Sequence, residues 1–401
     1  MESVIPQIDA AVQSSNYAGL DAVFGKSKGC WTMFGQGEQR TLAAHFVKAV
    51  VASKDFLPAA FSSGDMMEVM LTTLSHLPTT VENAADSTLR QKLFEYKVNE
   101  DDDYSGAAKV LSEMRMDDVV GSVYYMSPSD TCDILVKVAE CYLEEDETVA
   151  ADAAVTKAGS AVESIANPEE NMAIILRYKS TCARVLDANR KFIQAGSRYH
   201  ELSQADGDMI DSDELLNFLG RAVTCAILAP SSSQRKKVLG LLFKDSRLPQ
   251  LDSITEFQSH SSILKKMYMN QIIPKDDALK KFESSLAVHQ KAVMGDGLTI
   301  MERGVIEHNM IGVSKLFRTI YFSELGRILG VSTHKAEKIA ATMIMEGSLV
   351  GSIDQVEGIL SFDSDELVLQ SWDEAIDSFC VQLNSVTEEV KLSMESAPMV
   401  S

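Results

Sequence analysis

The feature that most constrains the fold is the stretch 320–362, where two short helical patterns precede two short strand patterns. Ser323 is expected to cap the first helix, and Gly330 is expected to end it. Ser332 is expected to cap a second helix, whose apolar residues recur at the i, i+3, i+4, i+7 spacing of one helix face. Gly347 stands where a left-handed residue commonly ends a helix. The pattern indicates a helix-turn-helix.

The strand patterns cover 349–353 and 359–362. Between them, Gly358 can supply the positive φ that a hairpin loop needs. A helix expected from 299 to about 316 precedes the helix-turn-helix and completes the unit. A helix-turn-helix followed by a two-stranded wing is a winged helix.

The upstream sequence is expected to be helical, with apolar residues at helical spacing in 40–51 and 65–77 even in the less regular first hundred residues. From about residue 130 a repeat begins: 141–143, 184–186 and 226–228 each close a long amphipathic helix, at spacings of 43 and 42 residues. Each is followed by a second helix, predicted over 147–161, 191–203 and 232–244. Helix pairs of this period stack into a right-handed α-solenoid of the tetratricopeptide or HEAT kind.

The sequence therefore predicts a mostly α-helical chain of four segments. They are a helical arm (1–129), a helical-repeat solenoid (130–295), a winged helix (296–363) and a C-terminal helix (364–401).

The last segment carries an apolar stripe with spacings of 4, 3, 4, 3 and 4 residues, which is typical of a bundle or coiled-coil helix. Its members are Trp372, Ile376, Phe379, Leu383, Val386 and Val390. No second stripe of this kind exists in the chain, so we expect the tail helix to pack in a bundle with partner helices. The alternative is that it folds back on the solenoid.

The charge balance disfavours nucleic acid as the partner of the winged helix. The chain carries a formal net charge of −21, and 297–362 holds six Lys or Arg against seven acids. Binding to a phosphate backbone requires an excess of cations. We therefore expect the winged helix to bind protein through the open edge of its wing, with Leu349, Ile353 and Ile359 at the contact.

No catalytic, cofactor or metal motif is present. The seven histidines form no HxH or HExxH pair, and the six cysteines form no CxxC pair. His308, inside a predicted helix, is expected to be structural or to lie on the surface. No apolar run reaches the length of a membrane span and the N-terminus is not that of a signal peptide, so a cytoplasmic and nuclear protein without a membrane partner is expected.

Several short segments carry a family resemblance. They are 184–187 (RVLD), 190–193 (RKFI), 198–203 (RYHELS), 242–245 (LFKD), 305–309 (VIEHN), 335–340 (KAEKIA) and 353–355 (IDQ). In this order they resemble the PCI-domain family and, within it, the fourth-subunit branch of the COP-nine signalosome.

The resemblance implies a non-catalytic scaffold and substrate-sensing subunit of the complex that removes the ubiquitin-like Nedd modifier from cullins. It implies PCI subunits as partners of the winged-helix edges, all subunits as partners of the bundle helix, and a cullin-RING ligase as partner of the N-terminal arm. The alternatives are the paralogous PCI subunit of the proteasome lid, a winged-helix nucleic-acid-binding protein and an unrecognised enzyme.

Overall fold

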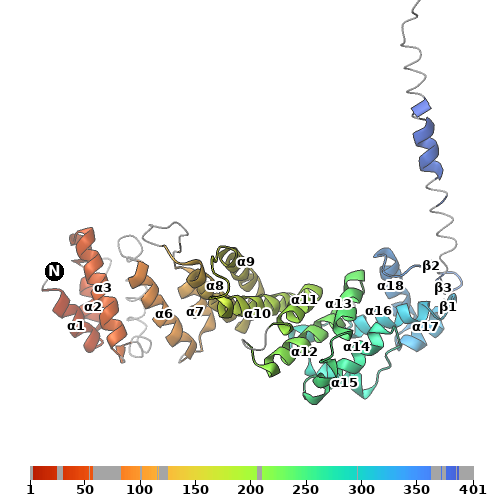
Figure 1. Cartoon of the computed structure of the whole chain (residues 1–401), viewed down its shortest axis with the longest axis horizontal. Helices are drawn as coiled ribbons and strands as arrows, with labels where there is room; N and C mark the ends of the chain where they lie inside the picture. Colours follow the sequence, from red (N-terminus) through yellow and green to blue (C-terminus); the bar gives the residue numbers. More distant parts are fainter. Residues whose placement is uncertain are drawn as a thin grey trace, which may run out of the picture. The chain divides into compact units, whose positions relative to one another are not determined.

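The computed structural model describes most of the chain, and Figure 1 shows its helices and strands in sequence order. The described residues are 3–24, 30–53, 55–56, 83–99, 102–114, 116, 125–205, 210–295, 297–362, 372, 376–384 and 386–387. The chain divides into two compact units, 1–222 and 223–401. The helix expected over 65–77 lies outside the described residues, and the four-segment division stays a prediction.

The first unit is helical throughout its described part. Its elements are α1 (Ile5–Gln13), α2 (Tyr17–Phe24), η1 (Cys30–Met33), α3 (Gln36–Ala52), α6 (Asn83–Asn99), α7 (Tyr104–Ser112), α8 (Pro128–Glu144), α9 (Thr148–Glu163), α10 (Met172–Ala188) and α11 (Phe192–Ser203). Helix α12 (Ser212–Leu228) runs across the boundary to the second unit. Its buried apolar clusters include one among α1, α2, α3 and α6, one among α7 to α10, and a smaller one between α8 and α9.

Stacked helix pairs confirm the predicted repeat. Helix α8 packs against α9, α10 packs against α11, and the two pairs contact each other. The loops inside the two pairs share a left-handed residue. Asp146 (φ 57°) and Arg190 (φ 60°) each lie one residue before the N-cap of the second helix. In each loop the next amide donates back to a carbonyl in the last turn of the first helix, from Glu147 to Tyr142 and from Lys191 to Leu186.

The second unit continues with helices and ends in a small sheet. Its elements after α12 are α13 (Ser233–Phe243), η3 (Leu248–Ser253), α14 (His260–Tyr268), α15 (Asp277–Ser285), η4 (His289–Lys291), α16 (Ile300–Ser314), β1 (Thr319–Tyr321), α17 (Phe322–Leu329), α18 (Thr333–Met345), β2 (Ser352–Asp354) and β3 (Ile359–Ser361). Helices α16, α17 and α18 and the sheet enclose one apolar core, whose fully buried members include Met310, Leu325 and Leu360. This is the predicted winged helix.

The local signals that define the winged helix are in place. Ser332 caps α18 by accepting a hydrogen bond from the amide of Lys335. Gly330, Gly347 and Gly358 all have positive φ, between 67° and 68°. A side chain at any of the three would strain the backbone, so glycine is required to end α17, to end α18 and to turn the hairpin.

Two expected boundaries of the winged helix are wrong. Helix α17 begins at Phe322 with Tyr321 as its N-cap, so Ser323 lies inside the helix instead of capping it. The reason is that Phe322 is buried in the core directly after β1. Strand β2 begins at Ser352 instead of Leu349, because Leu349 belongs to the core and the Gly351 backbone lies against the Ser361 carbonyl.

Candidate interaction surfaces of the C-terminal unit

Buried polar residues in the middle of α16 hydrogen-bond to the backbone of a neighbouring segment. The Asn309 side chain accepts a hydrogen bond from the Ile273 amide at 2.7 Å and donates to the Ile273 carbonyl at 2.9 Å. Beside it, Nε2 of His308 donates to the Gln271 carbonyl at 2.9 Å. Burial lowers the pKa of His308 to about 4. His308 and Asn309 are therefore structural, since they satisfy backbone groups of the segment 271–273 that packs on α16.

A buried arginine supports the same region. The guanidinium of Arg235 donates to the carbonyls of Ala226 and Ile227, at 3.1 and 2.9 Å, near the C-terminal end of α12. Burial lowers its pKa to about 10, and the charge of Glu307 opposes that shift. Glu307 is itself paired with Arg303 at 2.9 Å. The cluster holds helices together and contains no nucleophile positioned beside a base.

The sheet of the winged helix has three strands in the order β1-β3-β2, and both neighbours pair antiparallel to β3. Strand β3 is therefore the central strand, and β1 and β2 are the two edges. An edge strand keeps one row of backbone donors and acceptors open to another strand. The third strand, β1, was not expected, and it replaces β3 as one of the two edges of the sheet.

The two faces of the sheet have different roles. Ile320, Leu360 and Ile353 form one cross-strand row that packs into the core. Tyr321, Ile359 and Asp354 form a row on the opposite face.

The three residues that were expected at a partner contact lie in different environments. Leu349 is only 4% exposed and belongs to the core, and Ile353 packs against the core, whereas Ile359 lies on the outer face. Sequence reasoning missed Tyr321, which is 58% exposed beside Ile359. The aromatic and β-branched run 319–321 was the available signal for it.

Exposed apolar side chains accompany both edges. Val350 and Val356 flank β2, and Val356 at the hairpin is 97% exposed. Leu316 and Phe317 precede β1 and are also exposed. Apolar side chains beside an open strand edge are typical of a surface that pairs with another protein.

The tail presents a second apolar surface. Residues 376–384 are helical. The described members of the predicted stripe, Trp372, Ile376, Phe379, Leu383 and Val386, are each between 51% and 67% exposed. Val390 lies outside the described residues.

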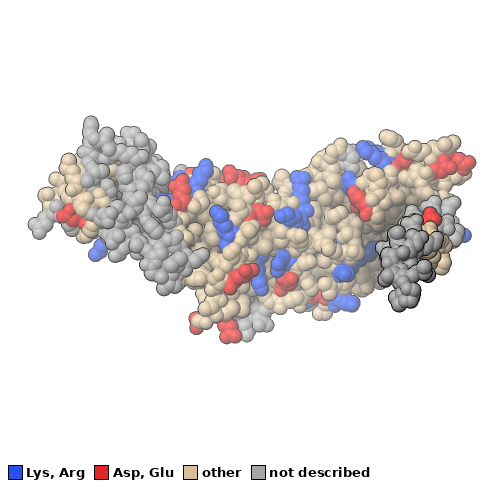
Figure 2. All heavy atoms as spheres, turned by 90° about the horizontal axis from the view of Figure 1, so that it is seen from above, with Lys and Arg blue, Asp and Glu red and all other residues tan. Residues whose placement is uncertain are grey.

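The described surface shows mixed charge (Figure 2) and no metal-binding cluster. Lysines and arginines are interspersed with acids on the face drawn in Figure 2. Within the described ranges, no three His, Cys, Asp or Glu residues are grouped so that they could hold a metal ion.

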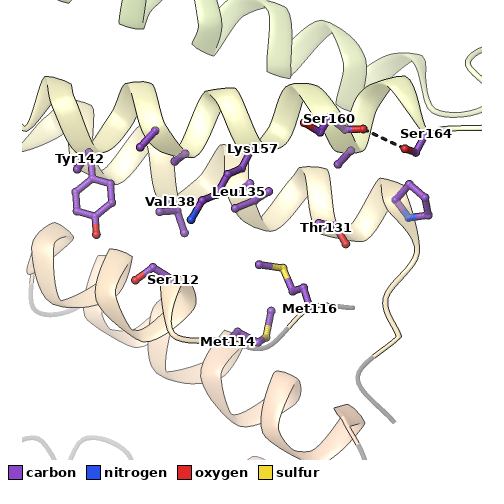
Figure 3. Close-up of a pocket in the computed structure, with 15 residues that line it drawn as sticks. Ser112, Met114, Met116, Thr131, Leu135, Val138, Tyr142, Lys157, Ser160 and Ser164 are labelled. Atoms are coloured by element: carbon purple, nitrogen blue, oxygen red, sulfur yellow. Dashed lines mark hydrogen bonds between the residues drawn. The ribbon is translucent and has the colours of Figure 1, made fainter. Parts of the chain in front are cut away.

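A groove of about 610 Å³ lies in the first unit, lined by residues of α8 and α9 and by the segment that follows α7. Figure 3 shows Met114 and Met116 on one side of it, across from Leu135, Val138 and Lys157. Among the described residues, its lining mixes apolar side chains with several hydroxyl groups and Lys157, and includes no carboxylate.

None of the described helices combines the length and the apolar character needed to cross a membrane.

The comparisons with known proteins agree with this architecture. The PCI domain family matches residues 258–364, and the family described as PSMD12/CSN4, N-terminal matches residues 43–213. The curated relatives include COP9 signalosome complex subunit 4 of three organisms. The Drosophila melanogaster protein is 41% identical over 64% of this chain and 60% of its own length. The Dictyostelium discoideum protein is 35% identical over 75% of this chain and 70% of its own length.

The Arabidopsis thaliana protein is 35% identical over 83% of this chain and 81% of its own length. A match of this extent, with both family regions in the expected order, leaves one assignment: the chain belongs to the COP9 signalosome complex subunit 4 family.

Proposed function

We propose that this chain is a non-catalytic scaffold subunit of a COP9 signalosome, the complex that removes the Nedd modifier from cullins in cullin-RING ligases. The observation that carries the proposal is the tail stripe, whose described apolar side chains are all more than half exposed. Fully burying a side chain of this size stabilises by about 1.5 to 3 kcal/mol before the costs of association. An unpartnered stripe of this kind is expected to enter a helical bundle built with other subunits.

The sheet of the winged helix supplies the second assembly contact of the proposal. One edge strand is expected to pair with the sheet of a neighbouring PCI subunit, with Tyr321 and Ile359 near the contact and Val350 and Val356 beside the alternative edge. Leu349 and Ile353, which were expected at the contact, support it in this proposal from below: their side chains pack in or against the core, and only their backbone lies near the edge.

The N-terminal helical arm is proposed to bind the cullin-RING substrate and to sense its arrival. It stands apart in sequence from the winged helix and tail that make the assembly contacts, and stacked helix pairs provide an extended surface for a partner. We place the protein in the cytoplasm and the nucleus, and we assign it no catalytic residue and no cofactor.

The experiment is affinity purification of the full chain from its native cell, with mass spectrometry of the proteins that co-purify. Recovery of signalosome subunits supports the proposal. Recovery of proteasome-lid subunits would replace the proposed role with that of the paralogous lid subunit. That alternative remains because the matched N-terminal family is described as PSMD12/CSN4. A chain that ends at Phe362 should fold but should no longer co-purify the partners.

The arm is tested separately by deleting residues 1–125. The shortened subunit should still assemble, and its complex should bind and process Nedd-modified cullin more weakly than the intact complex. Unchanged binding and turnover would refute the sensing role while leaving the scaffold role intact.

A further inference from the structure

A small groove in the winged helix lies between the loop before α16 and one face of α18. Its volume is about 260 Å³. The lining residues that matter for its chemistry are Met294, Leu298, Arg303, Lys335, Lys338 and Ile339. Neither the sheet edges nor the tail stripe includes this surface, so it lies outside the assembly contacts proposed above.

The floor of the groove is apolar. Leu298 and Ile339 are buried members of the winged-helix core. On α18, Lys335, Lys338 and Ile339 stand at i, i+3 and i+4, which places them on one face of the helix. The two lysines are exposed, as is Met294 on the side of the loop. The groove therefore offers an apolar slot between cationic side chains.

The charge of the groove contrasts with that of the whole chain. The protein carries a net charge of −21, yet the described residues lining this groove include three cations and no carboxylate; Asp296, in the same loop, is not among the described residues. Arg303 is engaged by Glu307 at 2.9 Å. Lys335 and Lys338 have no ion pair within the described part of the chain. Their ammonium groups are available to an outside carboxylate.

Helix α18 as a whole does not suit nucleic acid. Glu337 lies on α18 and Glu346 is its C-cap, and Glu337 accepts a hydrogen bond from Gln355 at 2.8 Å. Repeated phosphates would have to pass these acids, whereas a short peptide can contact two lysines locally. An apolar floor also fits an aliphatic side chain and gives a phosphate nothing to bond.

We propose that this groove binds an acidic peptide segment of a partner protein. Carboxylates of the segment contact Lys335 and Lys338, and one apolar side chain enters between Leu298 and Ile339. Charge complementarity provides selectivity and a salt-dependent association rate, while the apolar side chain sets the position of the segment.

The test measures binding of the full-length chain to a short fluorescent peptide with one central leucine flanked by glutamates. Saturable binding that weakens with added salt is expected. The double variant K335E/K338E should lose about tenfold in affinity, since two exposed charge contacts become repulsive. The control K236E/K237E makes the same change in net charge on exposed residues of α13 and should lose less than about twofold.

Two further peptides test the lysines and the apolar floor of the groove separately. A peptide with glutamine in place of glutamate and a peptide with serine in place of leucine should each bind more weakly than the original. K335A/K338A serves as a milder second variant, and thermal melting checks that each variant is folded.

Three results would overturn the proposal. They are an absence of saturable binding, equal losses in K335E/K338E and K236E/K237E, and displacement of the peptide by duplex DNA at lower concentrations than by unlabelled peptide. The last result would assign the groove to phosphate instead of carboxylate.

Discussion

The winged helix and the tail that follows it carry similar apolar patterns, but the pattern is buried in the winged helix and exposed in the tail. In the winged helix, the stripe of α18 formed by Ala336, Ile339, Ala340 and Met343 is buried against α16, α17 and the sheet. In the tail, the described stripe residues remain more than half exposed. The first pattern is satisfied within the chain, whereas the second is left for another molecule. A helical apolar period thus identifies a buried face without identifying the molecule that covers it.

The largest expected effect is on assembly through the tail. Phe379→Glu places a charge in the middle of the stripe, which should weaken incorporation into the complex at least about hundredfold, because apolar burial is lost and a carboxylate would have to be buried. The melting temperature of the isolated subunit should not change. Quantitative co-purification measures the effect.

The control for this variant is Val381→Glu, which adds the same charge to an exposed residue off the stripe. If Val381→Glu weakens assembly as much as Phe379→Glu does, the tail does not bind through one face.

A core substitution should affect stability instead of assembly. Leu360 is fully buried at the centre of β3, between Ile320 and Ile353. Leu360→Ala should lower the free energy of unfolding by about 2 to 5 kcal/mol, because it leaves a cavity in a packed core. Chemical denaturation of the isolated chain measures this change. Val356→Ala, at the exposed hairpin, should stay within about 0.5 kcal/mol of the original protein.

Acid should destabilise the second unit through two buried histidines. Burial lowers the pKa of both His260 and His308 to about 4 from the ordinary value of 6.5. Below pH 6.5 the unfolded chain binds protons that the folded chain does not, so stability is full above that pH and falls as the pH drops toward 4. At pH 5 the expected loss is about 2 kcal/mol for each histidine.

Denaturation midpoints between pH 8 and pH 5 measure the effect. Burial opposes protonation of His260, and the backbone hydrogen bond of Phe257 offsets only part of this effect on its pKa. Replacing His260 by glutamine should flatten the pH profile, and replacing the exposed His334 by glutamine should not. Equal profiles for the two variants would contradict this account.

The smallest expected effect is a change in stability when a residue with positive φ is replaced by glycine. The winged helix uses glycine at Gly330, Gly347 and Gly358, whereas the helix-pair loops place Asp146 and Arg190 in the same region of φ. Arg190→Gly should therefore be neutral or stabilise by up to about 1 kcal/mol, because the strain of a left-handed side chain is removed.

The matched control is Glu145→Gly, where φ is −93° and no strain exists. It should destabilise by about 0.5 to 1 kcal/mol, because glycine loses more conformational freedom on folding. Thermal melting of both variants provides the measurement, and destabilisation by Arg190→Gly equal to that by Glu145→Gly would contradict the strain argument.

Local signals predicted much of the winged helix. Ser332, Gly330, Gly347 and Gly358 were identified because caps and left-handed turns depend on a few neighbouring atoms, which the residue type alone can report. Strand β1 was missed because three residues hold too little pattern, and its pairing partner lies some forty residues later in the chain at β3. The N-cap of α17 was misplaced because burial of Phe322 outweighed the capping preference of Ser323.

The sequence by itself determined the helical class, the repeat, the winged helix and the tail stripe, because each follows from periodicity or from backbone preferences within a short segment. Only the tertiary structure decided that β3 is central, that Leu349 is buried while Tyr321 is exposed, and that two lysines of α18 border an apolar groove. The reason is physical: strand order, exposure and grooves depend on contacts between residues far apart in the chain, and no local preference encodes those contacts.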